Sequence, residues 1–360
     1  MLAHKKEDDI MTLHPMIKAF VIGLIGAGLF IVAGAPMPWL LGPLFAVLLL
    51  QLFTPITLKW HPRFRNVGLI IAGYVIGFAF TLQALQGMKE YFLSMLVINC
   101  VFFILFLLIS KLMTVWTKVD QATAMTCCVP GGLSQIVTFT EEQKNIDLTA
   151  VTFYHVLRVL MIVAIVPFIV AGGEPSHVEK VGQGDYSAPL LGLLILCYGA
   201  GIVAQKIRIP TAFLLGPVFL IMLFNLMGIS VPIMPKLFLH MAQLFIGIYI
   251  GLLLKKEDLK LTKRMIAYSF FSGAVLIACA YGISFALQQL YGLSFSTSFL
   301  SVVPGGLDQM GIIAASVHAD VTVVTAFQLF RILFVSVLIV PFVKIVAKRA
   351  ERKLEKSINV

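Results

Sequence analysis

The pentapeptide Val-Pro-Gly-Gly-Leu occurs twice in this chain, at residues 129–133 and again at residues 303–307. Proline does not continue a helix, and the two glycines leave the following backbone free to change direction. Apolar sequence of about membrane-spanning length surrounds both copies. Each copy therefore predicts a break inside an otherwise helical, apolar segment.

The composition defines the class of protein. Hydrophobic residues make up 59% of the chain and charged residues only 12%, which is more apolar sequence than one soluble core can bury. Apolar runs such as residues 16–32 have the length of membrane helices and lack the alternation of barrel strands. We therefore predict an all-α polytopic membrane protein.

The second half of the chain repeats the first. Leu41-Gly42-Pro43 recurs as Leu215-Gly216-Pro217, and Pro130 recurs at the same spacing as Pro304. After the breaks the spacing is shorter by a single residue, which pairs Arg158 with Arg331. Leucine-rich helices do not reproduce proline, glycine and arginine in order by chance, so the chain is a duplication.

Lysine and arginine in the loops predict the topology. They place residues 59–65, 111–118, 206–208 and 255–264 in the cytoplasm, provided that the two broken segments enter and leave on the same side. We therefore predict an inverted repeat of two homologous halves, each with about five full spans plus one re-entrant Pro-Gly-Gly segment. In the alternative topology the broken segments cross the membrane as unwound helices, which misplaces the charges of the central linker and the carboxyl-terminal tail.

These assignments divide the chain into five parts. Residues 1–14 form a cytoplasmic tail, 15–171 the first transmembrane repeat, 172–186 a linker, 187–347 the second repeat, and 348–360 a basic cytoplasmic tail. We expect a multi-pass protein of the cytoplasmic (cell inner) membrane, with both termini in the cytoplasm.

Polar residues inside the spans indicate a site. Arg158 and Arg331 lie near the centres of the last spans, where an ionised side chain needs a partner or a cavity. His155 and Gln328 lie three residues earlier, on the same helical faces. The candidate substrate-binding residues belong to these faces and to the two breaks: Pro130, Gly131, Gly132, Ser134, Gln135, His155, Arg158, Pro304, Gly305, Gly306, Asp308, Gln309, Gln328 and Arg331.

Matching broken helices in inverted repeats are typical of secondary transporters. Free N–H groups after the breaks, together with two guanidinium forks, suit a carboxylate. We predict secondary active transport of a small organic anion that binds near the membrane midplane. Asp308, whose counterpart is Ser134, would couple transport to protons or sodium. In the alternative interpretation, Asp308 neutralises one arginine and the other bonds backbone carbonyls that the breaks set free.

The pairing of Leu-Gly-Pro with Val-Pro-Gly-Gly-Leu in duplicated halves resembles the bacterial membrane AbrB family, over residues 15–345. The resemblance implies an integral membrane protein. The family carries labels as a regulator of gene expression and as an ammonia monooxygenase, and it is distinct from the small DNA-binding regulator of the same name. It leaves open a second function, a membrane sensor that acts indirectly on gene expression without transport.

The residues argue against the enzymatic label and against direct DNA binding. The seven histidines are scattered and the five cysteines lack metal-ligand spacing, so we expect no catalytic residues, no metal and no cofactor. No stretch is long enough for a soluble nucleic-acid-binding module. The expected partners are the anionic substrate and anionic lipids at the cytoplasmic face. Gly-x-x-x-Gly at residues 73–77 and 247–251 indicates close helix packing or a homodimer.

Overall fold

The computed structural model describes residues 2–129, 140, 146–171, 184, 186–207, 209 and 211–346. In the first half the described helices are α1 (Leu2–Val32), α2 (Pro38–Phe53), α3 (Pro62–Ala79), α4 (Leu82–Thr117), α5 (Gln121–Cys128) and α7 (Leu148–Val170). In the second half they are α8 (Ala188–Lys206), α9 (Ala212–Leu226), α10 (Lys236–Gly251), the 3-10 helix η1 (Lys256–Lys260), α11 (Lys263–Tyr291), α12 (Phe295–Val302), α13 (Leu307–Ser316), α14 (Val321–Phe334) and the π-helix η2 (Val335–Ile339).

Six helical segments of the described chain are long and apolar enough to cross a membrane. They are His14–Val32, Leu85–Thr117, Leu148–Val170, Ala188–Lys206, Lys263–Tyr291 and Val321–Val346. The protein is therefore an all-α polytopic membrane protein. The remaining predicted spans, α2, α3, α9 and α10, have only 15 to 18 residues. At about 1.5 Å per residue they extend roughly 23 to 27 Å, slightly less than a hydrocarbon core of about 30 Å.

Helix boundaries follow the duplication. The pairs α2 and α9, α3 and α10, and α5 and α12 all begin at the spacing that separates Pro130 from Pro304. The pair α7 and α14 begins at the spacing that separates Arg158 from Arg331. This last pair also starts in the same way, because the side chains of Asp147 and Asp320 accept bonds from the first backbone N–H groups of α7 and α14. Capping by aspartate fixes both helix starts.

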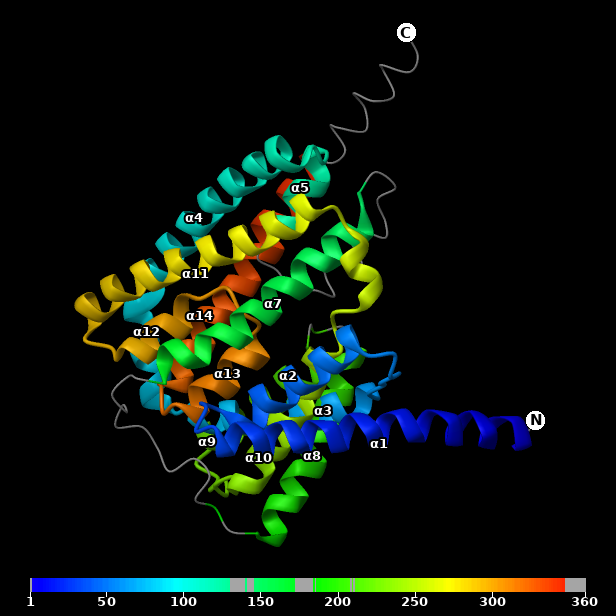
Figure 1. Ribbon diagram of the computed structural model, residues 1–360. Helices are drawn as coiled ribbons and strands as arrows, with labels where there is room; N and C mark the ends of the chain where they lie inside the picture. Colours follow the sequence, from blue (N-terminus) through cyan, green and yellow to red (C-terminus); the bar gives the residue numbers. More distant parts are fainter. Residues whose placement is uncertain are drawn as a thin grey trace.

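The first three helices of each half pack together as one bundle, with α2, α3, α9 and α10 between α1 and α8 (Figure 1). Glycine makes this packing close. A Cβ atom at Gly73 would lie 2.4 Å from the Leu214 carbonyl oxygen, and one at Gly247 would lie 2.5 Å from that of Leu40. The two Gly-x-x-x-Gly motifs thus bring α3 against α9 and α10 against α2 within one chain.

The remaining helices form a second bundle that contains both broken segments (Figure 1). Its longest members, α4 and α11, are equivalent helices of the two halves. Tyr268 at the start of α11 donates to the Ile109 carbonyl near the end of α4, at 2.5 Å. Tyr291 at the end of α11 lies 2.6 Å, oxygen to oxygen, from Ser94 near the start of α4. The two equivalent helices are therefore antiparallel.

Each broken segment returns to the end of the bundle from which it came. The Asp320 N–H, where α14 begins, donates to the Thr297 hydroxyl in the first turn of α12, at 2.9 Å. In the first half the Asp147 N–H donates to the Thr123 hydroxyl at 3.2 Å. Since α12 has 8 residues and α13 has 10 residues, a straight crossing would separate Thr297 from Asp320 by roughly 27 Å. The second segment is therefore a hairpin, and the described ends of the first segment meet in the same way.

The two hairpins open toward opposite ends of the bundle, because α7 touches the base of each. Asp147, which caps the start of α7, contacts the base of the first hairpin at Thr123. Val170, at the end of the same helix, accepts a bond from Ser296 at the base of the second hairpin, at 3.4 Å. The 23 residues of α7 separate the two bases by roughly 34 Å.

Candidate functional site

Arg331 bonds the end of α12, where the second break begins. It lies ten residues after the start of α14, or about 15 Å along the helix, which is half the thickness of a membrane core. Its Nη1 donates to the carbonyl oxygens of Val303 at 2.9 Å and Val302 at 3.3 Å, and its Nη2 donates to that of Gly305 at 2.9 Å. The carbonyls of Val302 and Val303 end α12 and have no helical donor beyond Pro304, and that of Gly305 lies in the break itself, so the guanidinium supplies donors to all three.

Gln328, one turn before Arg331, completes this network. Its Nε2 donates to the carbonyl oxygens of Leu300 at 2.7 Å and Val303 at 3.2 Å. Its Oε1 accepts a bond from Nη2 of Arg331. Gln328 and Arg331 are both buried. Together they hold the end of α12 against α14, which fixes the depth of the break.

The first half contains the equivalent contact. Arg158 of α7 donates from Nη1 to the carbonyl oxygen of Val129, directly after α5, at 2.9 Å. His155 lies one turn earlier, and its Nδ1 is 2.9 Å from the Val151 carbonyl oxygen. Both side chains are buried. Each half thus places an arginine against the carbonyl that precedes its Pro-Gly-Gly sequence.

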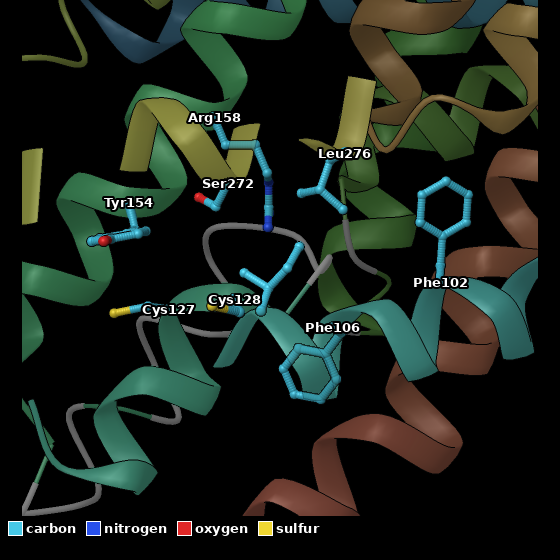
Figure 2. A pocket seen from close by; sticks show the side chains of 9 residues that line it. Phe102, Phe106, Cys127, Cys128, Tyr154, Arg158, Ser272 and Leu276 are labelled. Atoms are coloured by element: carbon cyan, nitrogen blue, oxygen red, sulfur yellow. The ribbon is translucent and has the colours of Figure 1, made fainter. Parts of the chain in front are cut away.

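Arg158 also borders a small cavity between α4, α5, α7 and α11. Figure 2 shows its side chain extending from α7 toward Cys128, between Ser272 and Leu276. The cavity measures about 10 Å³, which is near the space that one water molecule needs. Phe102 and Phe106 of α4 form an apolar wall.

The charge of Arg331 is buried among neutral groups. The side chain is 6% exposed, and its partners in the described part of the chain are three carbonyls and an amide. No carboxylate of the described residues forms an ion pair with it, and the like charge of Arg158 acts on it. A buried charge normally has a partner of opposite sign. The surroundings of Arg331 therefore suit an anion.

Asp308 and Gln309 begin α13, after the second break, and both are buried. Their side chains lie over Gly306, since a Cβ atom there would be 2.7 Å from Asp308 Oδ1 and still closer to Gln309 Oε1. Gln309 Oε1 has no hydrogen-bond partner among the described residues. A side chain at residue 306 would therefore displace the side chains of Asp308 and Gln309.

The charge that acts on Asp308 belongs to Arg65 at the start of α3. Arg65 also lies over the Tyr249 ring, with its guanidinium carbon 4.6 Å from the ring centroid. The alternative interpretation of the sequence has Asp308 neutralise one arginine while the other bonds carbonyls that the breaks set free. Bonding of arginine to such carbonyls is present in both halves. Neutralisation by Asp308 is wrong for Arg331, because no ion pair joins these two described residues.

The structure brings together nine of the predicted site residues in the second bundle: His155, Arg158, Pro304, Gly305, Gly306, Asp308, Gln309, Gln328 and Arg331. Pro130, Gly131, Gly132, Ser134 and Gln135 lie outside the described residues. Arg65 is an addition to the site. In the sequence, Arg65 only helps to place residues 59–65 in the cytoplasm, because nothing there connects it with Asp308 in the other half of the chain.

Comparison with known proteins gives the family. Residues 39–347 match the family described as transition state regulatory protein AbrB. The chain belongs to the AbrB family.

Two relatives support membership in the AbrB family. The protein YhjN of Bacillus subtilis (strain 168) is 27% identical, over 98% of each chain. A protein of Escherichia coli (strain K12) with the name "Putative regulator AbrB" is 26% identical, over 84% of this chain and 88% of its own. No solved structure matches the chain significantly. The resemblance seen in the duplicated motifs is thus confirmed for the family.

Proposed function

We propose that this AbrB-family protein is a secondary active transporter of a small organic anion of the carboxylate type. The substrate binds near the membrane midplane, between the tips of the two hairpins. The observation that carries this proposal is the buried charge of Arg331, which is bonded to neutral groups among the described residues. Arg158 holds the equivalent position in the other half. A planar fork can bind a carboxylate in bidentate fashion, and at Arg331 the carboxylate would take the place of carbonyl oxygens that accept from Nη1 and Nη2.

An inverted repeat across the membrane is part of the proposal. Its support is the antiparallel pair α4 and α11, and the two hairpins that open toward opposite ends of the bundle. In such a repeat, a site between two broken helices can face either side of the membrane by movement of one bundle against the other. Within this scheme the substrate contacts the break residues, His155, Arg158, Gln328 and Arg331.

The orientation follows from charge. The connections at residues 54–61 and 252–262 meet at one end of the protein, where Gln51 Nε2 donates to the Leu254 carbonyl at 2.7 Å. The first connection has Lys59, with Arg63 and Arg65 in the first turn of α3 that follows it, and the second has Lys255, Lys256 and Lys260, so this end faces the cytoplasm of a cell inner membrane. Both termini then lie in the cytoplasm. Anionic lipids gather at this face, and the protein makes no direct contact with nucleic acid.

Asp308 is the proposed coupling residue for protons or sodium. It lies at the contact between the two bundles, where α13 packs against α3. Arg65 of α3 provides the charge that acts on it. A proton or cation on Asp308 would change this electrostatic contact, and with it the relation of the two bundles. Transport then needs no enzymatic step, metal or other cofactor.

A second candidate function is a membrane sensor that binds the same anion without moving it and regulates gene expression indirectly. The description of the family and the name of the Escherichia coli relative favour this alternative. Its ligand site would consist of the same residues, so geometry does not separate the two functions.

Purified protein in proteoliposomes separates them. A panel of radiolabelled small carboxylates is offered with an inward proton gradient, with an inward sodium gradient, or with neither. The transporter accumulates at least one carboxylate above its external concentration, and only when a gradient is present. Thermal stabilisation of the protein by a carboxylate that is never accumulated would instead identify the sensor.

A further inference from the structure

A groove of about 620 Å³ lies at the end of the first bundle that we assign to the cytoplasm. One wall is the end of α2 and the connection that follows it, with residues 54–60. The other wall is the end of α10 and the connection to η1, with Tyr249, residues 252–253 and residues 255–257. Its volume is in the range of pockets that bind small molecules.

Hydrogen bonds between the halves hold the walls in place. Gln51 Nε2 donates to the carbonyl oxygens of Leu254 at 2.7 Å and Leu252 at 3.3 Å. Lys256 Nζ donates to the Thr54 carbonyl oxygen at 2.8 Å. The groove is thus a fixed feature of the fold, built from segments that belong to different halves of the sequence.

The rim of the groove is cationic. Lys59, Lys255 and Lys256 are exposed lining residues, and Glu257 supplies the opposite charge at one point. These lysines are not a consequence of the duplication. The repeat equivalents of Lys59, Lys255 and Lys256 are Ile233, Thr81 and Leu82, which carry no charge.

The inner surface of the groove is mainly apolar. Leu58, Trp60, Leu252 and Leu253 line it. The indole N–H of Trp60 is buried and has no acceptor among the described residues. Phe53, next to the lining residue Thr54, is 79% exposed. An apolar surface with a cationic rim suits an amphipathic anion better than a free phosphate, which has no apolar part.

We propose that this groove binds the headgroup of an anionic phospholipid, with the phosphate at Lys59 and Lys255 and the start of the acyl chains along the apolar wall. This site goes beyond the proposed transport. It rests on the proposed cytoplasmic orientation and would exist equally in a transporter or in a sensor.

The test is native mass spectrometry of delipidated protein, to which phosphatidylglycerol or phosphatidylcholine with the same acyl chains is returned. The wild type is expected to bind phosphatidylglycerol several-fold more tightly than phosphatidylcholine. Lys59→Gln with Lys255→Gln should weaken phosphatidylglycerol binding about thirtyfold, from the typical contribution of each of the two basic side chains near a lipid surface. This pair leaves the bond from Lys256 to Thr54 in place, so the groove keeps its shape.

The matched control is Lys111→Gln with Lys263→Gln, two exposed lysines outside the groove, which should change binding less than twofold. Equal loss in the groove variant and in the control would overturn the site. Displacement of the lipid by excess glycerol phosphate would also overturn it, because a free phosphate would then suffice. Lipid binding is measured without uptake, so its failure is distinct from failure of the transport proposal.

Discussion

Arg331 donates to the carbonyl oxygen of Val303 at 2.9 Å, and the equivalent Arg158 donates to that of Val129 at the same distance. The residues around each arginine differ, since Gln328 stands in one half where His155 stands in the other. The contact between arginine and the end of the broken helix is nevertheless the same. The arginines therefore have two roles in this account, to hold the breaks at mid-depth and to supply positive charge there.

Because Arg331 holds the second break at mid-depth, we predict a loss of stability in Arg331→Lys. A lysine ammonium does not reach Val303 and Gly305 with the geometry of a planar fork, so buried carbonyls lose their donors. We expect a loss of about 2 to 3 kcal/mol, seen as a lower melting temperature in detergent. The control is Arg264→Lys, at an exposed position of α11. Equal melting temperatures for the two variants would show that the fork does not hold the break.

Asp308→Asn should leave the protein almost as stable as the wild type. Asp308 makes no ion pair with Arg331, so the variant loses the attraction of the Arg65 charge and the favourable position of a negative charge in the first turn of α13, the latter worth roughly 0.3 to 1 kcal/mol. Carboxylate uptake in this variant should no longer respond to the ion gradient. Thermal unfolding and uptake are measured on the same preparation. A loss of about 3 to 5 kcal/mol would instead indicate a broken buried ion pair.

Gly73→Ala should destabilise the first bundle, because its Cβ would lie 2.4 Å from the Leu214 carbonyl oxygen. Relief of this overlap requires α3 to move away from α9, at a typical cost of about 1 to 3 kcal/mol. Gly28→Ala is the matched control, since no atom lies within 4 Å of its added Cβ and alanine is the better helix former. The melting temperature should fall only for Gly73→Ala. A fall of equal size in both variants would contradict the packing described here.

Cysteines at Thr297 and Asp320 should form a disulfide in a background without native cysteines. The backbone nitrogen of Asp320 lies 2.9 Å from the Thr297 hydroxyl, which brings the two Cβ atoms within reach of a bridge. Cysteines at Thr297 and Val337 should remain separate, because Val337 lies more than four helical turns beyond Asp320 along α14 and η2. Electrophoresis after mild oxidation reads the result. A bridge in the second pair but not in the first would show that the broken segment crosses the membrane.

The duplication and the two breaks were predictable because proline, glycine and arginine recur at fixed spacing. The bonds of the arginines to Val129 and Val303 were predictable as one of two alternatives, because a proline leaves carbonyls without helical donors. The effect of the Arg65 charge on Asp308 was not predictable. It depends on how the two bundles pack, and neither residue carries a local signal of the other.

The second role of the arginines, to supply positive charge at mid-depth, is tested most directly by the affinity for a carboxylate. The dissociation constant of the best-accumulated carboxylate is measured for the wild type, Arg158→Lys, Arg331→Lys and the Arg264→Lys control, each in nanodiscs below its melting temperature. The account predicts that both site variants bind at least tenfold more weakly than the wild type, because the ammonium keeps the charge but loses the fork. The control should match the wild type. Wild-type affinity and uptake in both site variants would contradict the account, and the two arginines would then only hold the broken helices in place.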